Sequence, residues 1–215
     1  MKARFLTSLL IVVGLGGCGG VFESEIPAAQ AFVLRLAPRP VVTPSATPHG
    51  SVLVQRPEAG PGLDSDRIAL LRSDHRFDFY AASRWAAPTP DMVESVIVDA
   101  LRASGNFSAV FDDTSPYAPR YSLRVTLRRF ESDYTAEGKG SGGRAPTVYV
   151  VLDCTLGRHR DRELLASFTA QGSAVAGEDR LTAVVAAFEA ATATAVAQLE
   201  QSIATAVESE SVPAK

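Results

Sequence analysis

Alternation of hydrophobic and polar residues is the clearest pattern in the second half of the chain. In residues 121–128, apolar positions alternate with serine, threonine and arginine, and the same period of two returns in residues 148–156. This period is typical of strands with one buried and one wet face. A third run follows at 164–170, so the pattern predicts an antiparallel three-stranded meander with a glycine-rich first turn at 136–146.

The middle strand of this meander carries apolar residues on part of its second face as well. Tyr149 and Val151 occupy positions that would otherwise be polar, so we expect a helix or a partner to cover them. Cys154 belongs to the buried set of the same strand. We therefore interpret it as a small buried hydrophobic residue and not as a reactive thiol.

A helical period follows the meander. From Leu181 to Ile203 the apolar residues recur at spacings of three and four, which predicts a long C-terminal helix lying on the sheet. Its many alanines favour close packing in the core. The same face would also suit contacts between copies of the chain, so a homo-oligomer remains open. From about Glu208 onward the residues predict a polar tail.

A second helix is predicted in the middle of the chain. Thr89 is a favourable N-cap residue, and Pro90 suits the first helical position. Apolar residues at helical spacing continue to Ser104, and Gly105 supplies a left-handed stop. We expect this helix to bury one apolar stripe.

Shorter apolar runs between turn-forming residues predict additional strands. These runs are 32–36, 51–55, 67–71, 77–80 and 107–111. The third and fourth runs are close enough to form a hairpin. The predicted fold is therefore α/β in the α+β sense: a mixed β-sheet with an antiparallel meander, packed by one mid-chain helix and a long C-terminal helix.

The first 17 residues have the pattern of a secretory signal peptide. Lys2 and Arg4 precede an apolar run that is about half as long as the roughly 20 residues of a membrane-spanning helix. The sequence that follows, Leu15-Gly16-Gly17-Cys18, resembles the lipobox of bacterial lipoproteins. Cleavage before Cys18 and acylation of its thiol, by chains such as palmitate, would hold the mature protein on a membrane.

The lipobox resemblance also bears on location and domain organisation. In lipoproteins of this type the residue after the cysteine biases sorting, and Gly19 is not the aspartate of an inner-membrane retention signal. We therefore expect the periplasmic face of the outer membrane. The predicted organisation is a signal peptide at 1–17, a lipidated tether at 18–30, a single domain at 31–207 and a polar tail at 208–215.

Composition narrows the class of protein. The net charge of the 215 residues is −3, and removal of Lys2 and Arg4 with the signal peptide makes it more negative by two charges. An acidic body argues against nucleic-acid binding. With Cys18 acylated, Cys154 has no partner within the chain, so no disulfide framework is expected.

Motifs for catalysis are missing from the sequence. The three histidines are dispersed over predicted loops, and the chain has no G-x-S-x-G motif. Acidic pairs such as Asp112-Asp113 lack the spacing of a calcium loop. We expect no catalytic residue, no metal and no cofactor, and hence no enzyme. Aromatic residues between Phe77 and Trp85 suit a core hairpin or, alternatively, a lipid groove.

One stretch resembles a known family. The sequence Pro61-Gly62-Leu63-Asp64-Ser65-Asp66-Arg67-Ile68, followed by Phe79-Tyr80-Ala81 and Arg84-Trp85-Ala86, is similar to the ABC-type transport auxiliary lipoproteins. The order of the lipobox, the central helix, the meander and the Ala-rich last helix agrees with that family.

This resemblance implies a role in transport. Members of the family accompany ABC transporters whose periplasmic substrate-binding subunit carries MCE (mammalian cell entry) domains, and these systems move phospholipids or other hydrophobic molecules. The implied partners are the MCE protein with its permease and ATPase, and the implied partner-binding residues are Leu63, Arg67, Tyr80 and Trp85. Two other classes stay open: a structural or assembly lipoprotein of the envelope without a transporter, and an envelope hydrolase.

Overall fold

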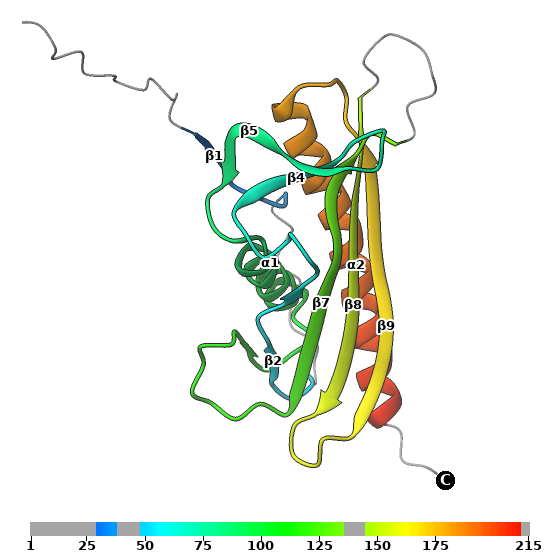
Figure 1. The fold of residues 1–215 in the computed structure, drawn as a ribbon. Coiled ribbons are helices and arrows are strands. Elements are labelled where there is room, and N and C mark those ends of the chain that lie inside the picture. The colour runs from blue at the N-terminus through cyan, green and yellow to red at the C-terminus, as the bar shows by residue number, and fades with distance from the viewer. Residues whose placement is uncertain (1–28, 38–47, 136–144, 212–215) are drawn as a thin grey trace, which may run out of the picture.

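A computed structural model describes residues 29–37, 48–135 and 145–211. The three long strands of the meander form its frame: β7 (Tyr121–Asp133), β8 (Thr147–Arg158) and β9 (Leu164–Val175). They pair antiparallel along almost their full length, as their alternation predicted. Figure 1 shows them side by side, with the long helix α2 (Leu181–Ser211) running along them.

Short strands complete a mixed sheet along the other edge of β7. Within the described residues the sheet has nine strands. Three of them pair parallel with successive parts of β7: β2 (Val52–Val54), β3 (Glu58–Ala59) and β4 (Arg67–Leu71). The hairpin partner of β4 is β5 (Phe77–Trp85), which pairs in turn with β1 (Gln30–Phe32). The last strand, β6 (Val110–Phe111), pairs with β2.

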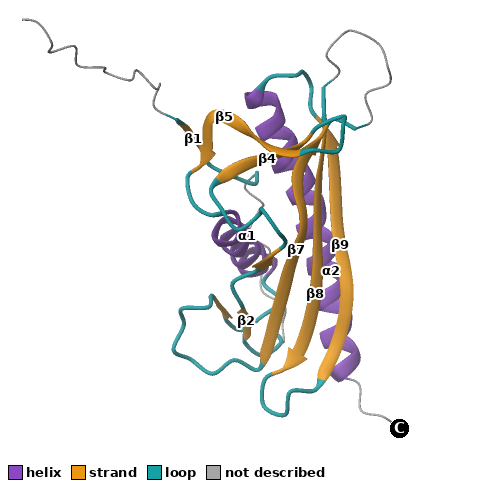
Figure 2. Cartoon of the chain, in the orientation of Figure 1, coloured by secondary structure: helices purple, strands orange, loops and turns teal. Residues whose placement is uncertain are grey.

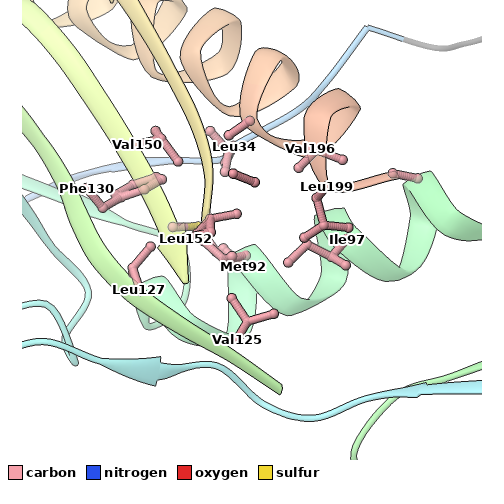
Figure 3. Close-up of a cluster of buried hydrophobic side chains, with 14 of the residues drawn as sticks. Leu34, Met92, Ile97, Val125, Leu127, Phe130, Val150, Leu152, Val196 and Leu199 are labelled. Atoms are coloured by element: carbon pink, nitrogen blue, oxygen red, sulfur yellow. The ribbon is translucent and has the colours of Figure 1, made fainter. Parts of the chain in front are cut away.

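Both helices pack against the buried face of the sheet (Figure 2). The central helix α1 (Thr89–Ser104) ends at Gly105, whose φ of 66° is the predicted left-handed stop. Buried apolar residues from α1, α2, β7 and β8 share one core, part of which is drawn in Figure 3. The predicted fold class is thus confirmed.

Helix α2 lies very close to β9, because the strand has a glycine at the contact. A Cβ atom at Gly172 would lie 2.0 Å from the carbonyl oxygen of Ala191 in α2. Alanine on the helix and glycine on the strand therefore allow their backbones to approach. By length and composition α2 could also span a membrane, but its apolar stripe is buried in this core.

Several predicted boundaries differ from the structure. The strand expected at 32–36 ends at Phe32, and the one expected at 107–111 is reduced to β6. Thr89 is not the N-cap of α1: Pro88 holds that position, and the Thr89 hydroxyl donates instead to the carbonyl oxygen of Ser65, 3.0 Å away. Helix α2 continues to Ser211, into the segment predicted as a polar tail.

Two predictions about the meander have separate outcomes. Cys154 is buried, as expected, and loss of solvation raises the pKa of its thiol to about 12. Tyr149 and Val151 were expected to lie under a helix or a partner: no helix among the described residues covers them, since both helices lie on the opposite face, and cover by a partner stays a prediction. The Arg129 guanidinium lies over the Tyr149 ring instead, 4.2 Å from its centroid.

The predicted signal peptide, Cys18 and most of the glycine-rich turn lie outside the described residues.

Candidate functional site

The motif that carries the family resemblance forms a turn against the edge of β7. The backbone N–H of Gly60 donates to the carbonyl oxygen of Leu127, at 3.0 Å, and Leu63 N–H donates back to Gly60 at 3.1 Å. Gly62 has a φ of +82°, which an L-residue adopts only with strain. This turn buries the Leu63 side chain, which is 5% exposed.

Two phenylalanines of β5 and one arginine of β4 lie beside this turn. The Phe77 ring packs on Gly62, where a Cβ atom would come within 2.7 Å of it. It meets the edge of the Phe79 ring at a centroid distance of 5.4 Å. The Arg67 guanidinium in turn lies 3.6 Å from the Phe79 centroid, a cation–π contact. Phe77 remains 43% exposed, which is unusual for so large an apolar side chain.

A β-bulge in β7 adds two further arginines to the same surface. The pairing of β7 with β8 shifts between Leu127 and Arg129. The shift interrupts the alternation, so consecutive Arg128 and Arg129 both line the outer face while Phe130 turns into the core. Bulges of this kind re-aim side chains, and this one concentrates positive charge next to Phe77.

Acidic neighbours fix one of these arginines but not the other. Arg129 Nε lies 2.5 Å from Glu131 Oε1, and its Nη2 lies 2.9 Å from Asp133 Oδ2. Arg128 Nη1 is 3.6 Å from Asp153 Oδ2, a long and largely exposed pair. Arg129 is therefore held rigidly, whereas Arg128 extends toward solvent.

The two carboxylates beside Arg129 respond differently to their surroundings. Burial raises the pKa of Glu131, although its bonds with Arg129 oppose the shift. Burial also acts to raise the pKa of Asp133, but hydrogen bonds from Thr135 and Arg129 outweigh it and the pKa is lowered. Asp133 is thus the firmer anionic partner of the arginine.

Together these residues form one surface, which we call the arginine–aromatic surface. It consists of Leu63, Arg67, Phe77, Phe79, Arg128, Arg129 and Tyr149. A shallow hollow of about 230 Å³ lies at its centre, between the turn and the bulge. Exposed aromatic and arginine side chains are the types enriched in protein–protein interfaces, so the surface is chemically suited to a protein partner.

Tyr80, another residue of the predicted partner-binding set, belongs to a hydrogen-bonded chain away from this surface. Its hydroxyl lies 2.9 Å from Ser132 Oγ and 2.8 Å from the Tyr134 hydroxyl. Tyr134 then donates to Asp179 Oδ1, at 2.7 Å, just before α2. Burial raises the pKa of both phenols, so each stays protonated and able to donate at neutral pH. The chain ties the β4–β5 hairpin to the start of α2.

Trp85 lies in the core and has no exposed surface. Its ring meets Phe130 and Phe188 edge-on at centroid distances of 5.9 and 5.2 Å. Of the four residues predicted to bind a partner, only Arg67 presents its side chain freely; Leu63 and Trp85 are buried and Tyr80 is half-buried. A partner-binding role for the set stays a prediction, in which the buried members would act by holding the surface.

Sequence reasoning missed the roles of Phe77, Arg128 and Arg129. A signal for the bulge was present, because two polar residues stand between Leu127 and Phe130 where strict alternation allows one. The exposure of Phe77 could not be seen in this way. It depends on the turn at Gly62, which reaches the hairpin only through the parallel pairing with β7.

The placement of the metal-binding residue types gives no sign of a metal site in the described part of the chain. Among the described residues no three His, Cys, Asp or Glu side chains gather closely enough to hold a metal ion. The three histidines lie far apart in the fold: His49 beside Phe107, His75 in the β4–β5 turn and His159 after β8.

Comparison with known proteins gives a consistent result. A family model described as "ABC-type transport auxiliary lipoprotein component" matches residues 32–204. Among solved structures, protein XCC0632 from Xanthomonas campestris is 27% identical, with a TM-score of 0.71 over 86% of this chain and 98% of that one. A second, uncharacterised protein shares the fold at 14% identity and a TM-score of 0.61, over 82% and 99% of the two chains. No curated protein matches the chain.

Proposed function

Because the chain belongs to the family of ABC-type transport auxiliary lipoprotein components, we propose that it serves an MCE-type ABC transporter that moves phospholipids or other hydrophobic molecules. The family is described as an auxiliary component and not as an enzyme, in agreement with the sequence-based expectation. The match over residues 32–204, nearly the whole folded domain, is the observation that carries the proposal.

The proposed location is the periplasmic face of the outer membrane. Membership of a lipoprotein family implies a membrane-anchored protein of the envelope. Acylation of Cys18 would provide the anchor, and Gly19 at the following position favours the outer membrane. A domain held on the tether 18–30 would dock the distal end of a periplasmic MCE assembly to that membrane.

We assign the docking contact to the arginine–aromatic surface. Phe77 is its most exposed apolar side chain, and Arg67 has no acidic partner among the described residues, so both are available to a protein partner. Leu63 supports the turn under Phe77, while Tyr80 and Trp85 fix the hairpin on the core. This division of roles gives each of the four predicted residues a place in the same contact.

The test is a pull-down of the full lipidated chain from crosslinked envelopes. Wild type is compared with Cys18→Ala and Arg67→Gln, and with Arg160→Gln as a matched control, since Arg160 is exposed near the other end of the sheet. We expect wild type and the control to recover an MCE protein with its permease or ATPase, and both other variants to recover at least about tenfold less, equivalent to ~1.4 kcal/mol.

Each alternative has its own outcome in this experiment. Good recovery of the bait without any MCE or ABC component would reject the transport role and leave an assembly lipoprotein without a transporter. Equal recovery with Arg67→Gln would reject the assigned surface while leaving the transport role intact. Hydrolysis of phospholipid by the purified protein would instead establish the envelope hydrolase.

A further inference from the structure

A groove of about 540 Å³ lies between α1 and the segment that follows β1. Its walls come from residues 33–37, 86–87 and 91–103. It shares no lining residue with the arginine–aromatic surface. Its volume falls within the range of about 300–1,000 Å³ that is usual for ligand-binding pockets.

The floor and most of the wall of the groove are apolar, while Arg35, Asp91, Ser95 and Asp99 lie among its lining residues. Leu34 and Met92 form part of the floor and belong to the hydrophobic core, where Figure 3 labels both. Above them, Val33 is 46% exposed, and Val96 and Ala103 are half-buried. An apolar wall thus continues outward from the core and ends at solvent, with no described side chain covering it.

Small side chains set the shape of the groove. Along α1 the lining positions Met92, Val96, Ala100 and Ala103 recur at spacings of four, four and three, so they follow one face of the helix. At 1.5 Å per residue this face is about 16 Å long. That is about half of the roughly 30 Å hydrocarbon thickness of a bilayer, and hence about the length of one acyl chain.

Three polar groups at the rim have partners within the protein, and one of them is the Asp99 carboxylate, which lies 3.9 Å from Arg102 Nη1. The Asp91 carboxylate accepts a hydrogen bond from Arg56 Nε at 2.5 Å. The backbone N–H of Arg35 donates to Glu189 Oε1 at 3.1 Å. A bound peptide strand would need free backbone groups in residues 33–37, and this central amide is taken. A polymethylene chain needs no hydrogen bond and is the better match.

The tether would bring this groove close to a bilayer. Cys18 and Gln30, where β1 begins, are twelve positions apart in the sequence, and residues 33–37 follow directly after the end of β1. At no more than about 3.6 Å per residue, the start of β1 stays within about 45 Å of the anchor. We propose that the groove binds one acyl chain of a membrane phospholipid; this rests on the lipid anchor and the lipid-transport role proposed above.

The experiment uses the full lipidated chain in vesicles of phosphatidylethanolamine and phosphatidylglycerol that contain a trace of phospholipid with a diazirine on its acyl chain. After irradiation, mass spectrometry locates the labelled peptides. We expect label in peptides containing residues 33–37 or 92–103. Ala103→Trp, which fills the groove, should reduce that label at least about tenfold, equivalent to ~1.4 kcal/mol of binding free energy.

Matched variants separate groove binding from mere closeness to the membrane. Ala186→Trp places the same side chain on an exposed position of α2 and should leave the labelling unchanged. Ser95→Phe narrows the groove from an exposed position of α1, so it tests the proposal even if Ala103→Trp fails to fold. Equal labelling in wild type and both groove variants, or label confined to other peptides, would overturn the proposal.

The outcome is also independent of the transporter pull-down. Recovery of an MCE or ABC component without label in the groove would reject the acyl-chain site and keep the accessory role. Label in the groove without any such component would keep the site and reject the accessory role.

Discussion

Two arginine clusters lie toward opposite ends of the long strands β7 and β8, and they differ in how fully their charges are paired. Near the β8–β9 turn, Arg158 lies 2.7 Å from each of three carboxylates, on Asp161, Glu163 and Glu210. The Tyr121 hydroxyl also donates to Glu210, at 2.7 Å. At the other end, Arg67 stacks on Phe79 without an acidic partner among the described residues.

The difference separates a structural cluster from a surface that is free to bind. Glu210 belongs to the last turns of α2, so the closed cluster fastens the end of that helix to the sheet. Burial acts to raise the pKa of Glu210, but hydrogen bonds from Tyr121 and Arg158 outweigh it and the pKa is lowered. In the arginine–aromatic surface, no carboxylate of the described residues pairs with Arg67 in this way. Arginine alone therefore does not mark a binding site; what matters is whether its partners lie within the fold.

The largest expected effect on stability comes from opening the closed cluster. Glu210→Gln removes the charge that Arg158 and Tyr121 share, and we expect the free energy of unfolding to fall by about 2 kcal/mol. Urea unfolding followed by circular dichroism measures it. Glu208→Gln, on an exposed position of the same helix, is the matched control and should change stability by less than about 0.5 kcal/mol. Equal losses in both variants would mean that the cluster does not fasten the helix.

The pH dependence of that loss tests its ionic origin. The folded-state pKa of Glu210 lies below its ordinary value of 4.5, so its contribution is present above pH 4.5 and disappears as the pH falls through the folded-state pKa. The difference in free energy of unfolding between wild type and Glu210→Gln should therefore be largest near neutral pH and should disappear in acid. Urea unfolding of both proteins at pH 7 and at pH 3 measures this difference. A difference that persists at pH 3 would contradict the ionic explanation.

A smaller loss is expected from the turn beneath Phe77. Gly62→Ala places a Cβ atom in a left-handed conformation, which costs about 1–2 kcal/mol, and forces the Phe77 ring to move. Thermal unfolding measures the loss, and the transporter pull-down should weaken as well. Gly177→Ala is the matched control, because a Cβ atom there meets nothing within 4 Å. If the two variants behave alike, the turn does not shape the surface.

The smallest effect on stability should come from the open surface itself. Arg67→Gln removes a cation–π contact at an exposed site, worth about 0.5–1 kcal/mol. Urea unfolding of the purified variant should show a loss no larger than this, while recovery of the partner falls much more. A loss of stability as large as that of Glu210→Gln would place Arg67 among the structural residues.

The periodic parts of the molecule could be predicted from sequence, and the parts that depend on distant pairing could not. Alternation in β7 to β9 and helical spacing in α2 are local patterns, so each of these elements can be recognised from its own residues. The apolar run at 51–55 indicated strand β2, but the two residues of β3 are too few to show a period, and β3 is defined by its pairing with a distant part of the chain in β7. The candidate site depends on such pairings. Family resemblance therefore named Arg67 and Trp85 together, although one is exposed and the other is in the core.

The central place of β7 has a consequence for the kinetics of folding. Its parallel partner β2 lies far back along the chain, with Val52 opposite Tyr121, and its antiparallel partner β8 follows it. Chains with many such distant contacts lose the entropy of closing long loops before the pairing of strands stabilises them. They therefore reach the native state in milliseconds to seconds instead of microseconds. Until β7 is complete, β2, β3 and β4 lack the strand on which they assemble. The newly made chain should therefore stay unfolded for most of its synthesis, which is the condition in which a chain can still pass through a narrow pore.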